Sequence, residues 1–125
     1  MNATKLNAQG NLVWAKKIGG PGNDYLGDII LSQSAVFLTG NFRETVDFDP
    51  NAGTSNLTSA GLQDAFIEKL DQQGNFIWAK RMGAAGDDRG ASIAHSSAGG
   101  LFTAGEFSGT VDFDPNDGVS NLNVN

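Results

Sequence analysis

The sequence predicts an all-β protein that contains two tandem copies of one unit, and three observations support this prediction. Lys5–Lys16 (Lys-Leu-x-x-x-Gly-Asn-x-x-Trp-Ala-Lys) returns 64 positions later as Lys69–Lys80, which indicates an internal repeat. Short apolar runs alternate with turn residues, and 17 of the 125 residues are glycine. No segment keeps the 3.6-residue apolar period of a helix, so almost no helix is expected.

A second matched block defines the limits of the repeat. Thr45–Asn51 (Thr-Val-Asp-Phe-Asp-Pro-Asn) returns unchanged as Thr110–Asn116, 65 positions later, so one residue is inserted near residues 96–100. We therefore expect one domain of residues 1–125 with repeats at about 5–68 and 69–125. A repeat buries its apolar face against neighbouring repeats, so the repeat period also indicates how the units assemble.

Four strands are expected in each copy, and in the first copy they begin with residues 11–17, after a Gln-Gly-Asn turn. The glycine-rich residues 19–24 then interrupt regular structure. Residues 25–31 form a continuous apolar run, which predicts a strand buried on both faces. Residues 35–40 form the next strand, with an expected bulge or bend at Gly40 and a continuation through Phe48 until Pro50 ends it. Residues 65–70 form the last strand.

Four strands in each unit of about 64 residues, repeated in tandem, are typical of propeller blades. Together with the motif of Lys5–Lys16, the patterns Gly-x-x-Gly-x-Asp, Phe-x-x-Thr-Val-Asp-Phe-Asp-Pro and Asp64–Leu70 resemble the bacterial SBBP β-propeller repeat. The resemblance covers practically the whole chain, and it implies a secreted or cell-surface bacterial setting. The chain departs from the family at residues 32–34 and 96–99, where the family usually has an Asp and a Gly-Asn turn.

By analogy with related propeller repeats, the strand of Ile29 is innermost, followed by the strands of Val36, Phe66 and Trp78. Named a to d in that order, the strands of the chain read c-d, a-b-c-d, a-b, which amounts to two four-stranded blades in permuted register. Two blades alone would expose apolar faces and strand edges. We therefore expect the a-b half of one copy to pair with the c-d half of the next, so that oligomerisation completes a ring. A homotrimer of six blades is preferred, then a homotetramer of eight; a fragment of a longer propeller is the alternative.

Composition excludes several classes of partner. The net charge of −6 argues against a nucleic-acid binder and against docking to anionic lipid. No apolar run approaches the roughly 20 residues that cross a bilayer, and Met1–Lys5 lacks the apolar core of a signal peptide. The chain has no cysteine, so disulfides and thiolate metal sites are excluded.

One repeated loop has the ligand types of a calcium site. Alternate positions hold carboxylate and amide oxygens, which a hard cation prefers, and the six candidate ligands are Asp47, Asp49, Asn51, Asp112, Asp114 and Asn116. The glycine that follows falls one place later than in an EF-hand loop, and Pro50 stiffens the segment. The preferred interpretation is that Asp and Asn initiate a turn after a strand by binding their own backbone, and a calcium site is the alternative. No cofactor is expected, and calcium at these loops is the one alternative.

Other motifs indicate structural roles. The Gly-Gly-x-Gly-x-Asp segment at residues 19–24 occurs once per unit, whereas calcium β-rolls stack it every nine residues, so a connection between blades is favoured. Trp14 and Trp78 can either stack on a sugar or pack between sheets. His95 is the single histidine and replaces Leu31, and no catalytic constellation can be identified, so no enzyme is expected.

The predicted function is that of a non-enzymatic interaction scaffold whose ring face binds protein or glycan. A purely architectural element without a ligand, either a fragment or a designed self-assembling subunit, is the alternative. A glycan-binding lectin or a polysaccharide-active enzyme ranks lower. Tyr25 and Arg89, at one matched loop position, are the main binding-type residues on that face.

Overall fold

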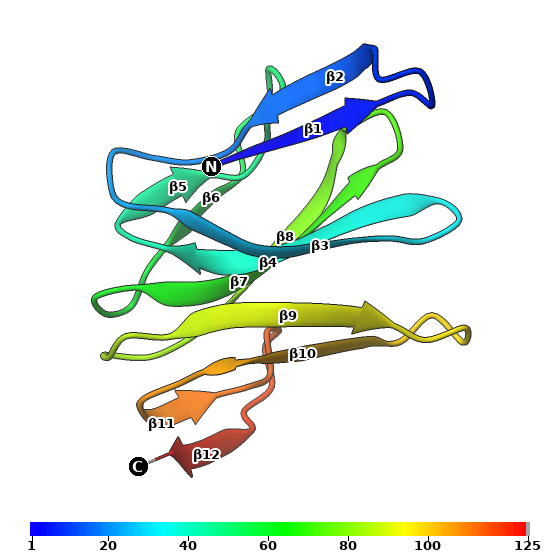
Figure 1. The fold of residues 1–125 in the computed structure, drawn as a ribbon. Coiled ribbons are helices and arrows are strands. Elements are labelled where there is room, and N and C mark those ends of the chain that lie inside the picture. The colour runs from blue at the N-terminus through cyan, green and yellow to red at the C-terminus, as the bar shows by residue number, and fades with distance from the viewer. Residues whose placement is uncertain (125) are drawn as a thin grey trace.

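The computed structural model describes residues 1–124, which form strands and loops and no helix (Figure 1), so the all-β prediction is confirmed. The strands are β1 (Asn2–Leu6), β2 (Leu12–Lys17), β3 (Tyr25–Leu31), β4 (Ala35–Phe42), β5 (Thr45–Asp47), β6 (Asn56–Thr58), β7 (Asp64–Asp71), β8 (Phe76–Met82), β9 (Arg89–His95), β10 (Leu101–Glu106), β11 (Gly109–Asp112) and β12 (Asn121–Val124).

The strands form one four-stranded sheet and four hairpins, all antiparallel. The four-stranded sheet has the order β3-β4-β7-β8, which is the strand order that the sequence predicts. Hairpins β1–β2 and β9–β10 lie on opposite sides of this sheet (Figure 1), so the two ends of the described chain lie at opposite ends of a stack. Within residues 1–124 no sheet closes on itself.

Two apolar cores fill the spaces on either side of the four-stranded sheet. Successive side chains of a strand point to opposite faces, so β4 sends Val36 and Leu38 into the first core and Phe37 into the second. The first core lies against β1 and β5, and the second lies against β9. The buried members are Ala3, Ile18, Val36, Leu38, Phe42, Val46, Phe48, Phe66 and Leu70 in the first core, and Ala35, Phe37, Ile67, Met82 and Ile93 in the second.

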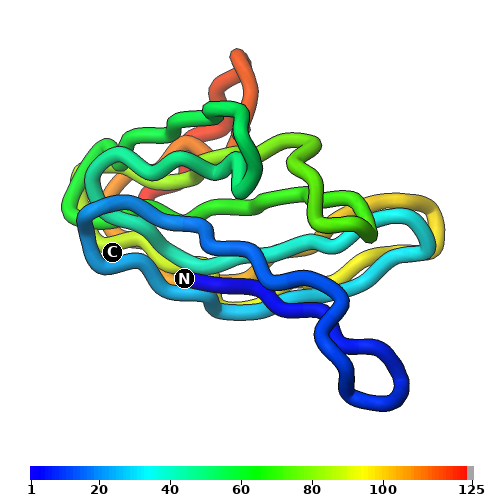
Figure 2. The backbone as a smooth tube through the Cα atoms, turned by 90° about the horizontal axis from the view of Figure 1, so that it is seen from above, coloured from blue at the N-terminus to red at the C-terminus, as the bar shows by residue number. Residues whose placement is uncertain are grey.

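Seen from above in Figure 2, the sheets overlap as layers, and the loop between β1 and β2 projects from the body. That loop is the predicted Gln-Gly-Asn turn, with Gly10 at a φ of 81° and its counterpart Gly74 at 78°. Hydrogen bonds join the four-stranded sheet to the hairpin β9–β10. The Asp28 carboxylate of β3 accepts them from the Ile93 amide (3.1 Å) and the Ser92 hydroxyl (3.2 Å) of β9.

The expected continuation of the strand at residues 35–40 through Phe48 is wrong. The strand β4 ends at Phe42, and Glu44 adopts a left-handed conformation with a φ of 61° that turns the chain out of the sheet. The strand β5 then pairs with β6, a strand that the sequence did not indicate. The bulge expected at Gly40 lies instead on the neighbouring strand, between Leu26 and Asp28.

The expectation that residues 25–31 are buried on both faces is also wrong. Ile29 is 43% exposed and Leu31 is 73% exposed. Ile29 pairs with Leu38 and Leu31 pairs with Val36, so both point to the face of the first core. They remain exposed because β3 is an edge strand and a cavity, rather than a further strand, separates them from β1.

Candidate functional site

The repeated Asp loops follow β5 and β11, and backbone amides satisfy part of their carboxylates. Asp47 Oδ1 accepts hydrogen bonds from the amides of Asp49 (3.0 Å) and Ser55 (2.7 Å), and Asp49 Oδ1 accepts one from Asn51 (2.9 Å). The bonds from Asp49 and Asn51 are those of Asx turns, in which a side chain replaces a backbone acceptor. The bond from Ser55 closes the loop across eight residues.

The second copy repeats this geometry. Asp112 Oδ1 accepts from Asp114 (3.0 Å) and Ser120 (2.7 Å), and Asp114 Oδ1 accepts from Asn116 (2.9 Å). The amide of Ser120, followed by that of Asp114, holds the pKa of Asp112 below its usual value. The turn-forming role of these carboxylates therefore has direct structural support in both copies.

The late glycine of the motif has a steric explanation. A Cβ atom on Gly53 would collide with the Asp49 carboxylate, and a Cβ atom on Gly118 would collide with that of Asp114. The carboxylate folds back over the glycine, so the glycine position is set by the closure of this turn.

A lysine lies beside each of these loops. Lys16 Nζ donates to Asn51 Oδ1, and Lys80 lines a cavity of about 320 Å³ together with Asp114 and Asn116. Within residues 1–124 no three His, Cys, Asp or Glu side chains gather in a way that could hold a metal ion. Calcium binding by these loops stays the alternative that the sequence offers beside the turn interpretation.

A polar cavity of about 330 Å³ lies between the four-stranded sheet and β9, and sequence reasoning found only part of it. Its lining side chains are Asn23, Tyr25, Asn41, Arg43, Gln63 and Arg89. Gln63, with its amide oxygen turned toward Arg89, accepts from Nε (2.7 Å) and Nη2 (3.2 Å) of that guanidinium. Two guanidinium groups and a phenol around one hollow are suited to binding a carboxylate.

Both arginines of this polar cavity also lie near acidic neighbours. Arg43 Nη2 lies 3.7 Å from Asp87, and Arg89 Nη1 lies 3.9 Å from Glu106. These pairs are exposed and long, so each contributes little to stability. Arg43 Nε is buried and has no hydrogen-bond partner among residues 1–124. The three segments that supply Arg43, Gln63 and Arg89 are distant in sequence, and no local motif could have joined them.

Sequence reasoning also missed Glu68 on β7. Its side chain is completely buried beside the first core, and neither carboxylate oxygen has a hydrogen-bond partner in the described part of the chain. Burial, and then the negative charge of Asp49, raise the pKa of Glu68 to about 8. The group is therefore mainly a neutral acid at neutral pH.

The matched tryptophans are half-buried and contact the two cores. Trp14 packs against the first core and donates from Nε1 to the Gln72 carbonyl (3.1 Å). Trp78 packs against the second core, with its ring centroid 6.3 Å from that of Phe37. His95 also lies on Phe37, stacked at 5.9 Å. These contacts support packing roles for both tryptophans and for the histidine.

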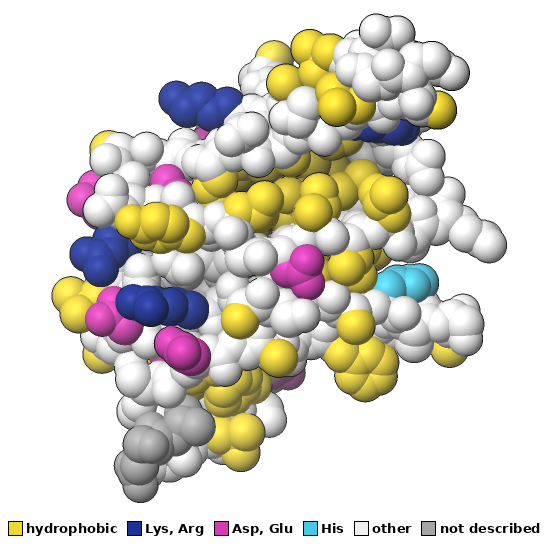
Figure 3. All heavy atoms as spheres, viewed as in Figure 1, with side chains coloured by type: hydrophobic (Ala, Val, Ile, Leu, Met, Phe, Trp, Pro, Cys, Tyr) yellow, Lys and Arg dark blue, Asp and Glu magenta, His cyan; other side chains and the backbone are white. Residues whose placement is uncertain are grey.

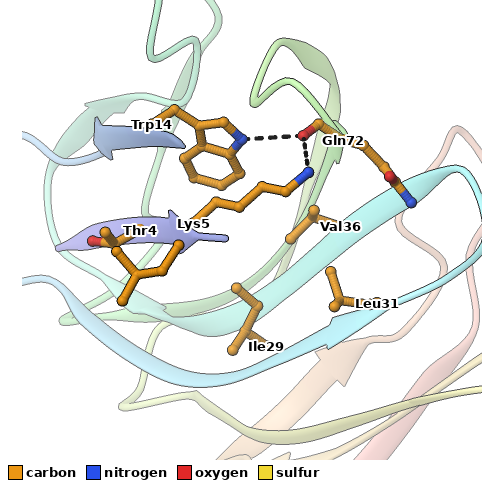
Figure 4. Close-up of a pocket in the computed structure, with 8 residues that line it drawn as sticks. Thr4, Lys5, Trp14, Ile29, Leu31, Val36 and Gln72 are labelled. Atoms are coloured by element: carbon orange, nitrogen blue, oxygen red, sulfur yellow. Dashed lines mark hydrogen bonds between the residues drawn. The ribbon is translucent and has the colours of Figure 1, made fainter. Parts of the chain in front are cut away.

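Trp14 also lines an apolar cavity of about 390 Å³ between β1 and β3. Figure 4 shows Trp14 and Lys5 on one side of it and Ile29, Leu31 and Val36 on the other. Lys5 Nζ donates to the same Gln72 carbonyl as Trp14, at 3.1 Å. The cavity lies on the side of β1 that has no strand partner within residues 1–124, where β1 pairs only with β2.

Comparisons with known proteins give one distant likeness. The chain is 25% identical over 117 residues to an uncharacterized WD repeat-containing protein, L264, of Acanthamoeba polyphaga mimivirus. The match covers 82% of this chain and 8% of that protein, so the chain spans less than a tenth of its relative's length. No protein-family model matches the chain. No solved structure matches it with significance. Among residues 1–124, no helix has the length and apolar content that a membrane crossing requires.

Proposed function

We propose that this chain is a non-enzymatic scaffold of β-propeller type, whose copies join head to tail into a closed ring. Three observations support the proposal. The sequence repeats a unit of about 64 residues, the described sheets follow the order of propeller strands, and the distant viral relative is named for WD repeats.

The observation that supports the assembly most directly is that each flanking hairpin equals one half of the four-stranded sheet. In β1–β2, Lys5 lies opposite Trp14, as Lys69 lies opposite Trp78 in β7–β8. In β9–β10, Phe102 lies opposite Ala94, as Phe37 lies opposite Ile30 in β3–β4. Pairing β10 of one copy with β1 of the next would therefore rebuild a sheet with the order β9-β10-β1-β2.

The exposed apolar side chains support the same contact. Figure 3 shows hydrophobic side chains gathered below hairpin β1–β2, over β3. Ile29 and Leu31 belong to this surface, and Phe102 is 66% exposed on β10. A sheet built across copies would cover these groups, which favours association.

Solution mass measured by light scattering during size-exclusion chromatography tests the proposed ring. A sharp peak at three or four times the chain mass of 13.1 kDa is expected, with three chains preferred because they supply six blades. A monomer at micromolar concentration would contradict the assembly. It would favour the alternative in which this repeat pair belongs to a longer propeller or serves as a purely architectural fragment.

A second candidate function is recognition of an acidic group on a protein or glycan at the polar cavity of Tyr25, Arg43 and Arg89. The buried and unpartnered Arg43 Nε is the observation that favours it. Titration with a uronic-acid oligosaccharide should give binding that a neutral oligosaccharide lacks. Arg89→Ala should remove this binding, whereas Lys17→Ala, outside the polar cavity, should leave it unchanged.

The likeness of the motifs to the SBBP repeat supports a secreted or cell-surface bacterial setting for this scaffold. Fractionation of a producing bacterium tests this setting. Recovery in the medium or on the cell surface is expected, and recovery with the soluble cell contents would contradict it.

A further inference from the structure

The packing of Phe37 in the second core shows which side chains surround a phenylalanine at this position of the repeat. Phe37 is almost fully buried between the four-stranded sheet and β9. Its ring lies 6.3 Å from that of Trp78 and stacks on that of His95 at 5.9 Å. Lys69 Nζ lies 5.4 Å from the centre of the Phe37 ring, within the range of a cation–π contact. Phe37, Lys69 and Trp78 are cross-strand neighbours on three consecutive strands.

The apolar cavity beside β1 is lined by the repeat counterparts of these neighbours. Lys5 and Trp14 correspond to Lys69 and Trp78, and they are likewise paired across their hairpin. Leu31 corresponds to His95 and lines the cavity from β3. The cavity is therefore lined by the counterparts of Lys69, Trp78 and His95. Its lining does not include a counterpart of Phe37.

Hairpins β1–β2 and β7–β8 agree in a further detail. The pairing register shifts between Lys5 and Leu6 in one hairpin and between Lys69 and Leu70 in the other. The edge of β1 therefore matches the geometry that the edge of β7 presents to β4.

The counterpart of Phe37 is Phe102, 65 positions later, on β10. It is 66% exposed, and β10 pairs only with β9 within residues 1–124. Figure 1 shows β10 and β1 at opposite ends of the stack, so the ring cannot reach the cavity of its own chain. The exposed Phe102 ring of one copy would therefore suit the apolar cavity beside β1 of another copy.

We propose that the apolar cavity of Lys5, Trp14 and Leu31 is the docking site for Phe102 of a second copy. The pairing of β4 with β7 supplies the register, in which Phe37 lies opposite Lys69 and Leu38 lies opposite Glu68. By repeat equivalence, Phe102 of one copy lies opposite Lys5 of the next, and Thr103 lies opposite Thr4. This inference rests on the proposed self-assembly and specifies its register and its aromatic anchor.

The chemistry of the cavity suits a phenylalanine ring. Its walls are the indole of Trp14 and the aliphatic side chains of Ile29, Leu31 and Val36. The ammonium group of Lys5 is held in place by the Gln72 carbonyl, and it faces the space that a ring would occupy by analogy with Lys69. An aromatic side chain in a desolvated pocket is typical of an interface hot spot.

Disulfide formation tests the register, because the chain has no cysteine of its own. The variant with Thr4→Cys and Thr103→Cys keeps Phe102 and places both thiols at exposed strand positions. Mild oxidation should link chains through this pair, and non-reducing electrophoresis should then show dimers and larger species. Thr4→Cys with Ala104→Cys is the matched control. A slip of one residue points the side chains to opposite faces, so little linkage is expected from it.

The aromatic anchor is tested by Phe102→Ala, with mass measured over a range of concentrations. The dissociation constant of the assembly should rise by roughly 10- to 100-fold. Val119→Ala, at a loop residue that is 75% exposed, should leave it unchanged. An assembled wild type with an unaffected Phe102→Ala variant and no linkage through residues 4 and 103 would overturn this inference and leave the ring intact. A monomeric wild type would overturn the proposed ring itself.

Discussion

Glu68 brings an ionisable side chain into an apolar core, and no group within residues 1–124 forms a hydrogen bond with its carboxylate oxygens. Its counterpart in β1 is Thr4, so the repeat does not require an acid at this place. A neutral carboxylic acid tolerates such surroundings far better than a carboxylate does. The raised pKa is the consequence, and it makes the stability of the first core depend on pH.

The free energy of unfolding should therefore fall as pH rises from about 5 to about 8. The folded state binds the Glu68 proton more tightly than the unfolded chain, with a pKa of about 8 against an ordinary value of 4.5. The stabilisation is complete below the unfolded value and is lost as pH rises through the folded value. Glu68→Gln should remove this dependence, a difference of about 2–4 kcal/mol between pH 5 and pH 9.

Urea unfolding of the wild type and of Glu68→Gln at a fixed protein concentration measures this difference. Glu44→Gln, at an exposed carboxylate, is the control and should keep the wild-type pH dependence. Parallel pH profiles for wild type and Glu68→Gln would show that Glu68 does not titrate in this range.

At the scale of elements, two residues with a left-handed backbone conformation set where strands end. Glu44 follows β4, and both positions lie at the start of a small hairpin. Glu44 and Gly109 occupy the same position in the two copies, with φ values of 61° and 75°. Glycine adopts this conformation freely, whereas a residue with a Cβ atom is strained in it. The glycine of the second copy was the signal in the sequence for the turn found in the first.

Substitutions at these two positions should have different effects on stability. Gly109→Ala should cost about 1 kcal/mol, and the cost should be conformational, since nothing lies within 4 Å of the added Cβ atom. Glu44→Gly should be neutral or stabilising by up to about 1 kcal/mol, because relief of strain competes with a more flexible unfolded chain. Chemical unfolding of both variants checks this. A destabilised Glu44→Gly would mean that the Glu44 side chain contributes more than its backbone costs.

The Asp loops have two interpretations, a turn held by backbone hydrogen bonds and a calcium site. Removal of metal ions distinguishes between them. The turn interpretation accounts for the bonds that Asp47 and Asp112 accept from backbone amides. We therefore expect EDTA to leave the melting temperature unchanged. Structural calcium would instead lower it by several degrees on chelation and raise it on addition of calcium, because a bound ion stabilises the folded state. Magnesium addition is the control for a nonspecific effect of divalent ions.

At the scale of the whole molecule, stability and the proposed assembly would depend on the same surfaces. The first core is closed partly by Ala3 and Trp14 of hairpin β1–β2, and the proposed ring uses the outer edge of that hairpin. Unpaired strand edges favour association with other chains. The cooperative unit is therefore expected to be the assembled ring, whose melting temperature should rise with protein concentration.

Deleting Met1–Lys17 should abolish the closed ring, because it removes β1–β2 and with them the edge that would accept β10. Light scattering should show a monomer or a broad distribution, and circular dichroism should show how much β structure survives. A well-behaved oligomer with the wild-type number of chains would contradict assembly through paired half-sheets.

The sequence by itself determined the all-β class and the repeat, because these depend on local periodicity and on matched positions. The order of strands in the four-stranded sheet came from the resemblance to propeller repeats. Tertiary structure alone decided the features that join distant segments. They include the hairpin β5–β6, the exposure of Ile29 and Leu31, the meeting of Arg43 with Gln63 and Arg89, and the burial of Glu68. The physical reason is that local patterns report which residues can form a strand. The cost of burying a charge, or of leaving an apolar face uncovered, depends on what packs against it.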